Sequence, residues 1–394
     1  MLDKPLIVVK GFDVQGFFPG IIPRSTYQIF AAIVANPNTN QGILSDGADL
    51  DGYDLVYVDF DNGTDYIQRN AYLLERVIRW VNQNKTGTQP NAIIAMSMGG
   101  LVAQYALCDI ENTPANAAYP HQVSLLITHD SPHQGANVPL GFQMAVRHLA
   151  GTVIRNPIGS DIALVSRLPI LGAARDALYS PAAQQMLRYQ TSQLASGAFS
   201  TQGSAVASVN SLYTSFQQEY QALLASRGGT PSGTPGQPCR VVANSNGSEC
   251  GKGQPFSPYD ELVGITMTQN VQNFPILNGL LATGTIITTA GAAYYGAAVV
   301  SGPIAIAAAG ALSIVALGLT GAYDLTADFH VRALPDQQQQ SIYNVFAQVN
   351  KRTRLFGLFR VQFDLLNFHA DSNAAMLPLD SGSGGIISLA AYAQ

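Results

Sequence analysis

The chain has 394 residues, of which 20 are Lys or Arg and 25 are Asp or Glu, so only 11% are charged, against roughly 25% in an average soluble domain. A hydrophobic content of 47% excludes a disordered chain, and a net charge of −5 argues against nucleic acid as a partner. Three cysteines are too few for a disulfide framework. The composition therefore indicates a globular protein with ample core and a weakly charged surface that would suit contact with lipid.

Short apolar runs alternate with helical patterns in the first third of the chain. Apolar residues recur at helical spacing from Ile67 to Val81, and a second helix is expected after Gly100. Four runs suit strands buried on both faces of a parallel sheet, at residues 6–9, 55–58, 92–95 and 123–128. The order predicts an α/β fold with a doubly wound, mostly parallel sheet, whose first part spans residues 1–137.

The pattern changes after residue 137. Residues 138–235 are predicted to be mostly helical, and a Gly/Pro-rich loop ends this block. Another core strand, at 239–243, is expected within residues 236–260. The simplest account is a helical cap inserted between two strands of one sheet.

Residues 262–323 contain no Asp, Glu, Lys, Arg or His. They predict an apolar helical hairpin within 261–325, with helices at 279–300 and 304–323 that approach the roughly 20 residues needed to span a bilayer. Either the hairpin is buried in the protein, or residues 279–323 contact a membrane. The last part, 326–394, is expected to hold strands at 326–335 and 354–366 joined by a helix around 337–349.

The motif that indicates chemistry is Ala95-Met96-Ser97-Met98-Gly99. It directly follows a predicted strand and directly precedes a predicted helix, where a sharp turn needs small residues two before and two after the nucleophile. Such a turn lifts the Ser97 hydroxyl above the sheet, at a helix N-terminus that favours a developing oxyanion. A second oxyanion donor is expected after an earlier strand, so the backbone N–H groups of Phe12 and Met98 are predicted to form the oxyanion hole.

The sequence resembles the α/β-hydrolase superfamily, and in particular Bacteroidetes-type esterase/lipase-like proteins. The matching stretches are residues 3–13, 53–59, 61–71, the Ser97 turn and 128–137, with weaker similarity at 180–187 and 377–385. The resemblance implies carboxylic-ester hydrolysis by a Ser-acid-His triad, without a metal or cofactor, in a bacterial secreted or cell-envelope protein. No signal peptide is recognised in this chain, so its location stays open.

The other two triad members are less well defined. Asp380 is the predicted acid because it lies in a stretch similar to the family, with Asp260 and Glu249 as alternatives by topology. The family order of Ser, acid and then His would put the His beyond residue 394. Within the chain His369, beside Asp371, is the fallback base, while His133 is interpreted as structural or substrate-facing.

Two hypotheses about function follow. The favoured one is a serine esterase or lipase acting on small-molecule or lipid esters with apolar acyl chains, with the cap and hairpin shaping an acyl pocket or lid. An acyltransferase that uses the same acyl-enzyme is a variant of this hypothesis. The alternative is a non-catalytic, membrane-associated binding protein on a hydrolase scaffold.

Overall fold

The computed structural model describes residues 2–12, 52–116, 118–136, 138, 140–154, 162–167, 169–190, 202–206, 208–209, 211–234, 236–245, 261–271, 323–332, 340–352 and 360–371. The chain divides into two compact units. The first comprises residues 1–136, 179–188 and 211–246, and the second comprises residues 137–178, 189–210 and 247–394.

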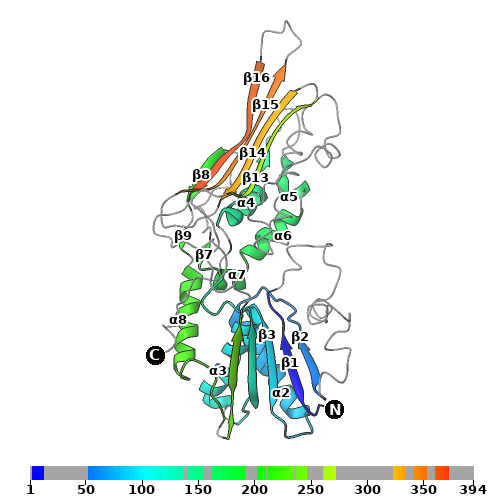
Figure 1. The fold of residues 1–394 in the computed structure, drawn as a ribbon, viewed down its shortest axis with the longest axis vertical. Coiled ribbons are helices and arrows are strands. Elements are labelled where there is room, and N and C mark those ends of the chain that lie inside the picture. Colours follow the sequence, from blue (N-terminus) through cyan, green and yellow to red (C-terminus); the bar gives the residue numbers. More distant parts are fainter. Residues whose placement is uncertain are drawn as a thin grey trace. The chain divides into compact units, whose positions relative to one another are not determined.

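Five parallel strands form the sheet of the first unit, in the order β12-β4-β3-β1-β2 (Figure 1). In chain order they are β1 (Pro5–Val9), β2 (Asp54–Val58), β3 (Asn91–Met96), β4 (Val123–His129) and β12 (Arg240–Asn244). All five strands predicted for this sheet are present, and the predicted parallel α/β arrangement is confirmed.

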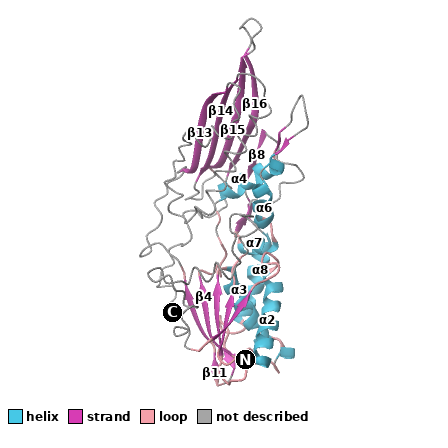
Figure 2. Ribbon diagram, turned by 90° about the vertical axis from the view of Figure 1, so that its right-hand side faces the viewer, coloured by secondary structure: helices cyan, strands magenta, loops and turns pink. Residues whose placement is uncertain are grey.

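Helices α2 (Ile67–Asn84), α3 (Met98–Asn112) and α8 (Ser211–Ala225) lie on one side of this sheet (Figure 2). The inward residues of α2, among them Leu74 and Ile78, are fully or almost fully buried, which is the amphipathic pattern seen in the sequence. Nearly every residue of α3 is buried because it packs against α2, α8 and the sheet. The helix that follows the motif is therefore the central helix of this unit.

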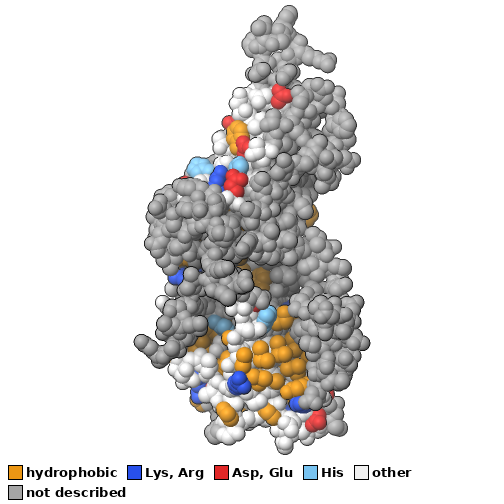
Figure 3. All heavy atoms as spheres, viewed as in Figure 1, with side chains coloured by type: hydrophobic (Ala, Val, Ile, Leu, Met, Phe, Trp, Pro, Cys, Tyr) orange, Lys and Arg blue, Asp and Glu red, His pale blue; other side chains and the backbone are white. Residues whose placement is uncertain are grey.

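The opposite face of the sheet is also apolar. Side chains such as Leu6, Tyr57 and Ile94 are half-buried there, and Val242 is 36% exposed. Figure 3 shows hydrophobic side chains gathered over these strands on the face turned away from α2 and α3. Parallel strands with apolar residues on both faces normally have both faces covered.

Two helices in the stretch predicted as cap pack in the first unit. They are α7 (Pro181–Met186) and α8. The Ser180 hydroxyl accepts a hydrogen bond from the Ala183 N–H at 3.3 Å and Pro181 takes the first helical position, so this proline starts a helix. Smaller elements of this unit are the 3₁₀ helix Pro114–Asn116 and the hairpin of β10 (Gly233–Thr234) and β11 (Gln237–Pro238).

The helices of the second unit are α4 (Leu140–Gly151), α5 (Leu164–Arg167) and α6 (Pro169–Leu178). Two short antiparallel pairs accompany them: β5 (Val153–Ile154) with β6 (Ile162–Ala163), and β7 (Tyr189–Gln190) with β9 (Ser208–Val209). On α4, His148 is fully buried, stacks on Phe368 at 4.1 Å between ring centroids, and lies 2.9 Å from the Tyr343 hydroxyl. Its position is structural.

An antiparallel sheet, which the sequence did not predict, organises the second unit. Its order is β13-β14-β15-β16-β8, with only β8 running parallel to its neighbour. The bounds are β8 (Gln202–Val206), β13 (Glu261–Val271), β14 (Tyr323–Arg332), β15 (Ser341–Arg352) and β16 (Arg360–Asp371). The strands predicted at 326–335 and 354–366 overlap β14 and β16.

The helix predicted around 337–349 is wrong, because residues 341–352 form β15. From Tyr343 onward the buried residues Tyr343, Val345 and Ala347 alternate with half-buried ones, which is the period of a strand. The helix was predicted because the glutamines at 337–340 favour a helix by propensity, which tertiary pairing overrides.

An apolar helical hairpin was predicted for residues 261–325, but both ends of this range lie in strands. Residues 261–271 form β13 and residues 323–325 begin β14, while 279–322 lie outside the described residues. In the portions of the chain that the structure describes, no helix combines the length and apolar character needed to cross a membrane.

Candidate active site

Ser97 occupies a strained turn between β3 and α3. Its backbone angles are φ 50° and ψ −125°, which a residue with a side chain rarely adopts and which costs on the order of 1–3 kcal/mol. The serine precedes the first helical residue, yet its side chain makes no capping hydrogen bond. Its side chain is exposed whereas Met98, Gly99 and Gly100 are buried. A serine that only capped the helix would show the opposite features.

Backbone contacts hold this turn in place. The Ser97 N–H donates to the His129 carbonyl at 2.8 Å, which ties the turn to the end of β4. A Cβ on Gly99 would lie 2.5 Å from the Lys10 carbonyl oxygen, and a Cβ on Gly11 would lie 3.0 Å from the Ser97 Cβ. Gly99 therefore has no room for a side chain and Gly11 very little, so the segments after β1, β3 and β4 converge on Ser97.

The predicted oxyanion donors flank the serine. Phe12 follows Gly11, whose backbone lies against Ser97, and the Phe12 side chain packs on the edge of the hydrophobic core. Met98 is the first residue of α3, and the first N–H groups of a helix have no carbonyl partner within the helix. Met98 and the Gly11-Phe12 segment thus both lie close to Ser97 at the carboxyl edge of the sheet, and the role of their N–H groups remains a prediction.

Lys10 is a supporting residue that the sequence did not reveal. It is 5% exposed at the end of β1, and its ammonium group contacts the Asp59 carboxylate and donates to the Phe60 carbonyl at 3.1 Å. Its own carbonyl is the one that Gly99 approaches. A charged residue directly between an apolar strand and a glycine was the only signal for this role.

His133 lies close to this edge, but both of its ring nitrogens are engaged. Nδ1 is 2.9 Å from the Tyr220 hydroxyl and Nε2 is 3.3 Å from the Thr128 hydroxyl. Because the Tyr220 hydroxyl lies 2.6 Å from Gln104 Oε1 and donates there, it accepts from Nδ1–H, which leaves Nε2 as an acceptor for Thr128. Burial lowers the pKa of His133 to about 4, so the ring is neutral near pH 7. These contacts support the structural interpretation of His133.

The other histidines divide between the two units. His121 is buried in the first unit, where Nε2 lies 2.9 Å from Glu111 Oε1. In the second unit His330 lies within β14, and its Nδ1 is 2.7 Å from Glu261 Oε1. His369, the fallback base, lies within β16, with an exposed side chain, and pairs in register with Asn344.

The predicted acids Asp380, Asp260 and Glu249 lie outside the described residues. The structure therefore shows the serine, its turn and the neighbouring backbone, while the acid and the base stay predictions. Cys108 and Cys239 are free thiols, with pKa values that burial raises to about 12 and about 11. Within the described ranges no group of three or more His, Cys, Asp or Glu residues is placed to hold a metal ion.

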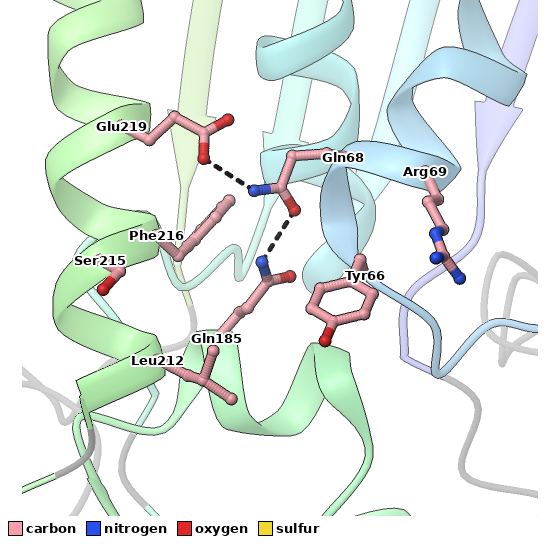
Figure 4. A pocket seen from close by; sticks show the side chains of 8 residues that line it. All are labelled: Tyr66, Gln68, Arg69, Gln185, Leu212, Ser215, Phe216 and Glu219. Atoms are coloured by element: carbon pink, nitrogen blue, oxygen red, sulfur yellow. Dashed lines mark hydrogen bonds between the residues drawn. The ribbon is translucent and has the colours of Figure 1, made fainter.

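A hollow of about 400 Å³ lies between α2, α7 and α8 (Figure 4). Tyr66 and Arg69 line one side, and Leu212 and Phe216 line another. Ser97 does not line it, so it is separate from the candidate nucleophile.

Residues 54–225 match the family described as "PGAP1-like alpha/beta domain". This stretch contains the Ser97 turn and three of the five sheet strands. The first unit, with its parallel sheet, has the fold of the α/β-hydrolase superfamily. Ser97 lies within the matched stretch, at the strand-to-helix turn after β3.

Solved structures found to match this chain include a Bacillus licheniformis lipase in its mature form, at 20% identity and a TM-score of 0.23. The match covers 46% of this chain and 62% of the lipase, which is less than two thirds of the lipase's length. A Pyrobaculum calidifontis esterase matches at 15% identity and a TM-score of 0.26, with 62% of this chain and 67% of the esterase covered. No curated protein matches the sequence significantly.

Proposed function

We propose that this protein is a serine carboxylic-ester hydrolase that works through an acyl-enzyme on Ser97. The observation that carries the proposal is the turn itself, in which a strained and exposed serine stands at the carboxyl edge of a parallel sheet. Strain of this kind persists only where surrounding contacts impose it, and it concentrates at functional sites.

The reaction would run in two steps. The Ser97 hydroxyl attacks the ester carbonyl while a histidine takes its proton, and the alcohol leaves with that proton. Water then attacks the acyl-enzyme, and the acid and Ser97 are released. The N–H groups of Phe12 and Met98 would stabilise the oxyanion in both steps, as the Gly11 contact with Ser97 suggests. A substrate with an apolar acyl chain fits the low charge of the whole chain.

The carboxylate partner is proposed to be Asp380, with Asp260 and Glu249 as alternatives. The alternatives gain support from the sheet order, because β12 pairs in parallel with β4 and so ends at the same edge as Ser97. Glu249 follows the end of β12 by five residues, which reach about 17 Å at most when extended.

Labelling with a fluorophosphonate tests the nucleophile. Wild type should react and Ser97→Ala should not, while Ser131→Ala, a nearby serine that packs against Gly100, should react like wild type. Turnover of p-nitrophenyl esters should fall by at least about a thousandfold in Ser97→Ala. Equal labelling of wild type and Ser97→Ala would exclude Ser97 as the nucleophile, and no labelling with no turnover would favour the binding-protein alternative.

A second experiment identifies the acid and the base. Asp380→Asn should lower kcat by about a hundredfold or more, with Asp260→Asn and Glu249→Gln close to wild type. His369→Gln should retain activity if the base lies elsewhere. A large loss in Glu249→Gln alone would move the acid to the segment after β12.

Two assays define the substrate. Esters with acyl chains of increasing length should be cleaved faster as the chain becomes more apolar. Adding an acceptor alcohol then separates hydrolysis from acyl transfer, because an acyltransferase would form a new ester in place of free acid.

A further inference from the structure

The outward face of α2 carries large apolar side chains in a row. Tyr66, at its start, and Leu73 and Trp80 within it are 36%, 39% and 53% exposed. They recur every seven residues, which is about 20° short of two turns, so they lie in one line about 21 Å long. The opposite face of α2 packs into the core, and none of the three side chains belongs to that core cluster.

Arginines lie beside this row. Arg69 and Arg76 are exposed and stand about 50° around the helix from it. The Arg69 guanidinium lies over the Tyr66 ring at 5.3 Å and pairs with the Asp65 carboxylate at 3.1 Å. We call the surface formed by Tyr66, Arg69, Leu73, Arg76 and Trp80 the aromatic-arginine face.

A third arginine extends the surface toward a neighbouring loop. The guanidinium of Arg79 lies over the ring of Tyr119 at 5.0 Å, and that ring is 52% exposed. The acidic residue of α2, Glu75, points inward and is 9% exposed. Asp65 offsets Arg69, so Arg76 and Arg79 leave this surface with a local excess of positive charge, although the whole chain has a net charge of −5.

We infer that the aromatic-arginine face docks on the headgroup region of a lipid bilayer that contains anionic lipids. Tryptophan and tyrosine rings are enriched where hydrocarbon meets water, and a helix that lies in this interface combines such rings with basic residues. Arginines beside the rings complement the negative lipid phosphates. Because the net charge of the chain opposes general attraction to an anionic surface, binding must come from a local basic patch.

The inference concerns binding alone and goes beyond the proposed hydrolysis. Tyr66 and Arg69 also line the hollow between α2, α7 and α8, so the face ends in a concave region on the protein surface (Figure 4). A membrane bound along α2 would not need Ser97 to react, so failure of one proposal is distinguishable from failure of the other.

The experiment uses the tryptophan as its own reporter, since Trp80 is the only tryptophan in the chain. Full-length protein is titrated with vesicles of phosphatidylcholine alone or of phosphatidylcholine with phosphatidylglycerol. The emission should move to shorter wavelength with the anionic vesicles and little with the neutral ones. Binding is measured in parallel by vesicle sedimentation, which does not depend on Trp80.

Variants and matched controls separate the face from the rest of the surface. Arg76→Gln should weaken partitioning by about fivefold, and Trp80→Ser by about tenfold or more. Arg175→Gln removes an exposed arginine of the other unit, and Val242→Ser removes an exposed apolar side chain of the sheet, and both should bind like wild type.

Three results would overturn the inference. One is an unchanged Trp80 spectrum with anionic vesicles, and another is undiminished binding in both Arg76→Gln and Trp80→Ser. The third is a spectral shift that grows with protein concentration without lipid, which would assign the face to a second copy of this chain.

Discussion

The two ends of α3 differ in backbone strain and in how fully their side chains are hydrogen-bonded. At the N-terminal end Ser97 has a φ of 50°, an exposed side chain and no capping bond. At the C-terminal end the Glu111 side chain is 6% exposed and saturated with donors, from the Gly233 N–H at 2.7 Å, the Ser232 hydroxyl at 2.9 Å and the His121 ring at 2.9 Å. The backbone is strained at the end of α3 that bears the candidate nucleophile. At the other end, the buried carboxylate has hydrogen-bond donors around it.

Gly99→Ala should destabilise the protein at the N-terminal end of α3 and has the largest expected effect. Its new Cβ would lie 2.5 Å from the Lys10 carbonyl and 2.7 Å from the Val9 carbonyl, both backbone atoms that cannot move alone. The free energy of unfolding, measured with urea, should fall by about 3–5 kcal/mol. Gly236→Ala is the control, since Gly236 has a φ of 83° but nothing within 4 Å, and should lose about 1 kcal/mol. Equal losses would mean that close packing does not maintain the turn.

Glu111→Gln tests the saturated end. An amide cannot accept from all of these donors, so the free energy of unfolding at pH 7 should fall by about 2 kcal/mol. Burial opposes ionisation of Glu111, but hydrogen bonds from His121, Gly233 and Ser232 outweigh it and lower the pKa. The stabilisation is therefore present above the ordinary pKa of the unfolded chain and is lost as the pH falls through the lowered value.

Urea unfolding at several pH values checks this prediction. The gap between wild type and Glu111→Gln should narrow in acid. The control Asp176→Asn removes an exposed carboxylate paired with Arg175 and should change stability by less than about 0.5 kcal/mol. A gap that stays constant down to pH 3 would contradict the role given to the Glu111 charge.

Glu75→Gln tests a buried carboxyl group of α2 that lies near Asp109 of α3. Burial, together with the charge of Asp109 on α3, raises the pKa of Glu75 to about 8, and its Oε1 has no hydrogen-bond partner in the described part of the chain. A raised pKa means that the folded protein favours the protonated form, so wild-type stability falls as the pH rises from about 4.5 to 8. The variant should be about 2 kcal/mol more stable at pH 8 and similar to wild type at pH 4. Thermal unfolding at both values measures this, and equal effects at both would argue against it.

Ser97→Gly tests the strain directly and has the smallest expected effect. Glycine adopts a φ of 50° readily, whereas Ser97→Ala keeps the side-chain penalty, so the glycine variant should be about 1 kcal/mol more stable than the alanine variant. Both variants lack the hydroxyl, which makes each the control for the other. If the two unfold at the same urea concentration, the turn stores no strain.

Much of the parallel sheet, helix α2 and the position of the candidate nucleophile could be predicted from local sequence patterns. The continuous apolar runs at β1, β3 and β4 could be recognised because a parallel strand is buried on both faces, and the helical period of α2 because one face enters the core. Ser97 could be found because small residues two before and two after a serine, between a strand and a helix, are a steric requirement of the turn. The glutamines before β15 misled the prediction, since propensity is weak against pairing with β14 and β16.

The sequence by itself determined the parallel core, the place of Ser97 in it and the uneven distribution of charge, because these follow from residue order and from sterics within one turn. Only the tertiary structure decided that His133 is held by Tyr220 and Thr128, that Lys10 supports the turn beneath Ser97, and that Tyr66, Leu73 and Trp80 remain exposed. Those facts depend on contacts between segments far apart in the chain, and no local pattern specifies which side chains such contacts will bury or leave in water.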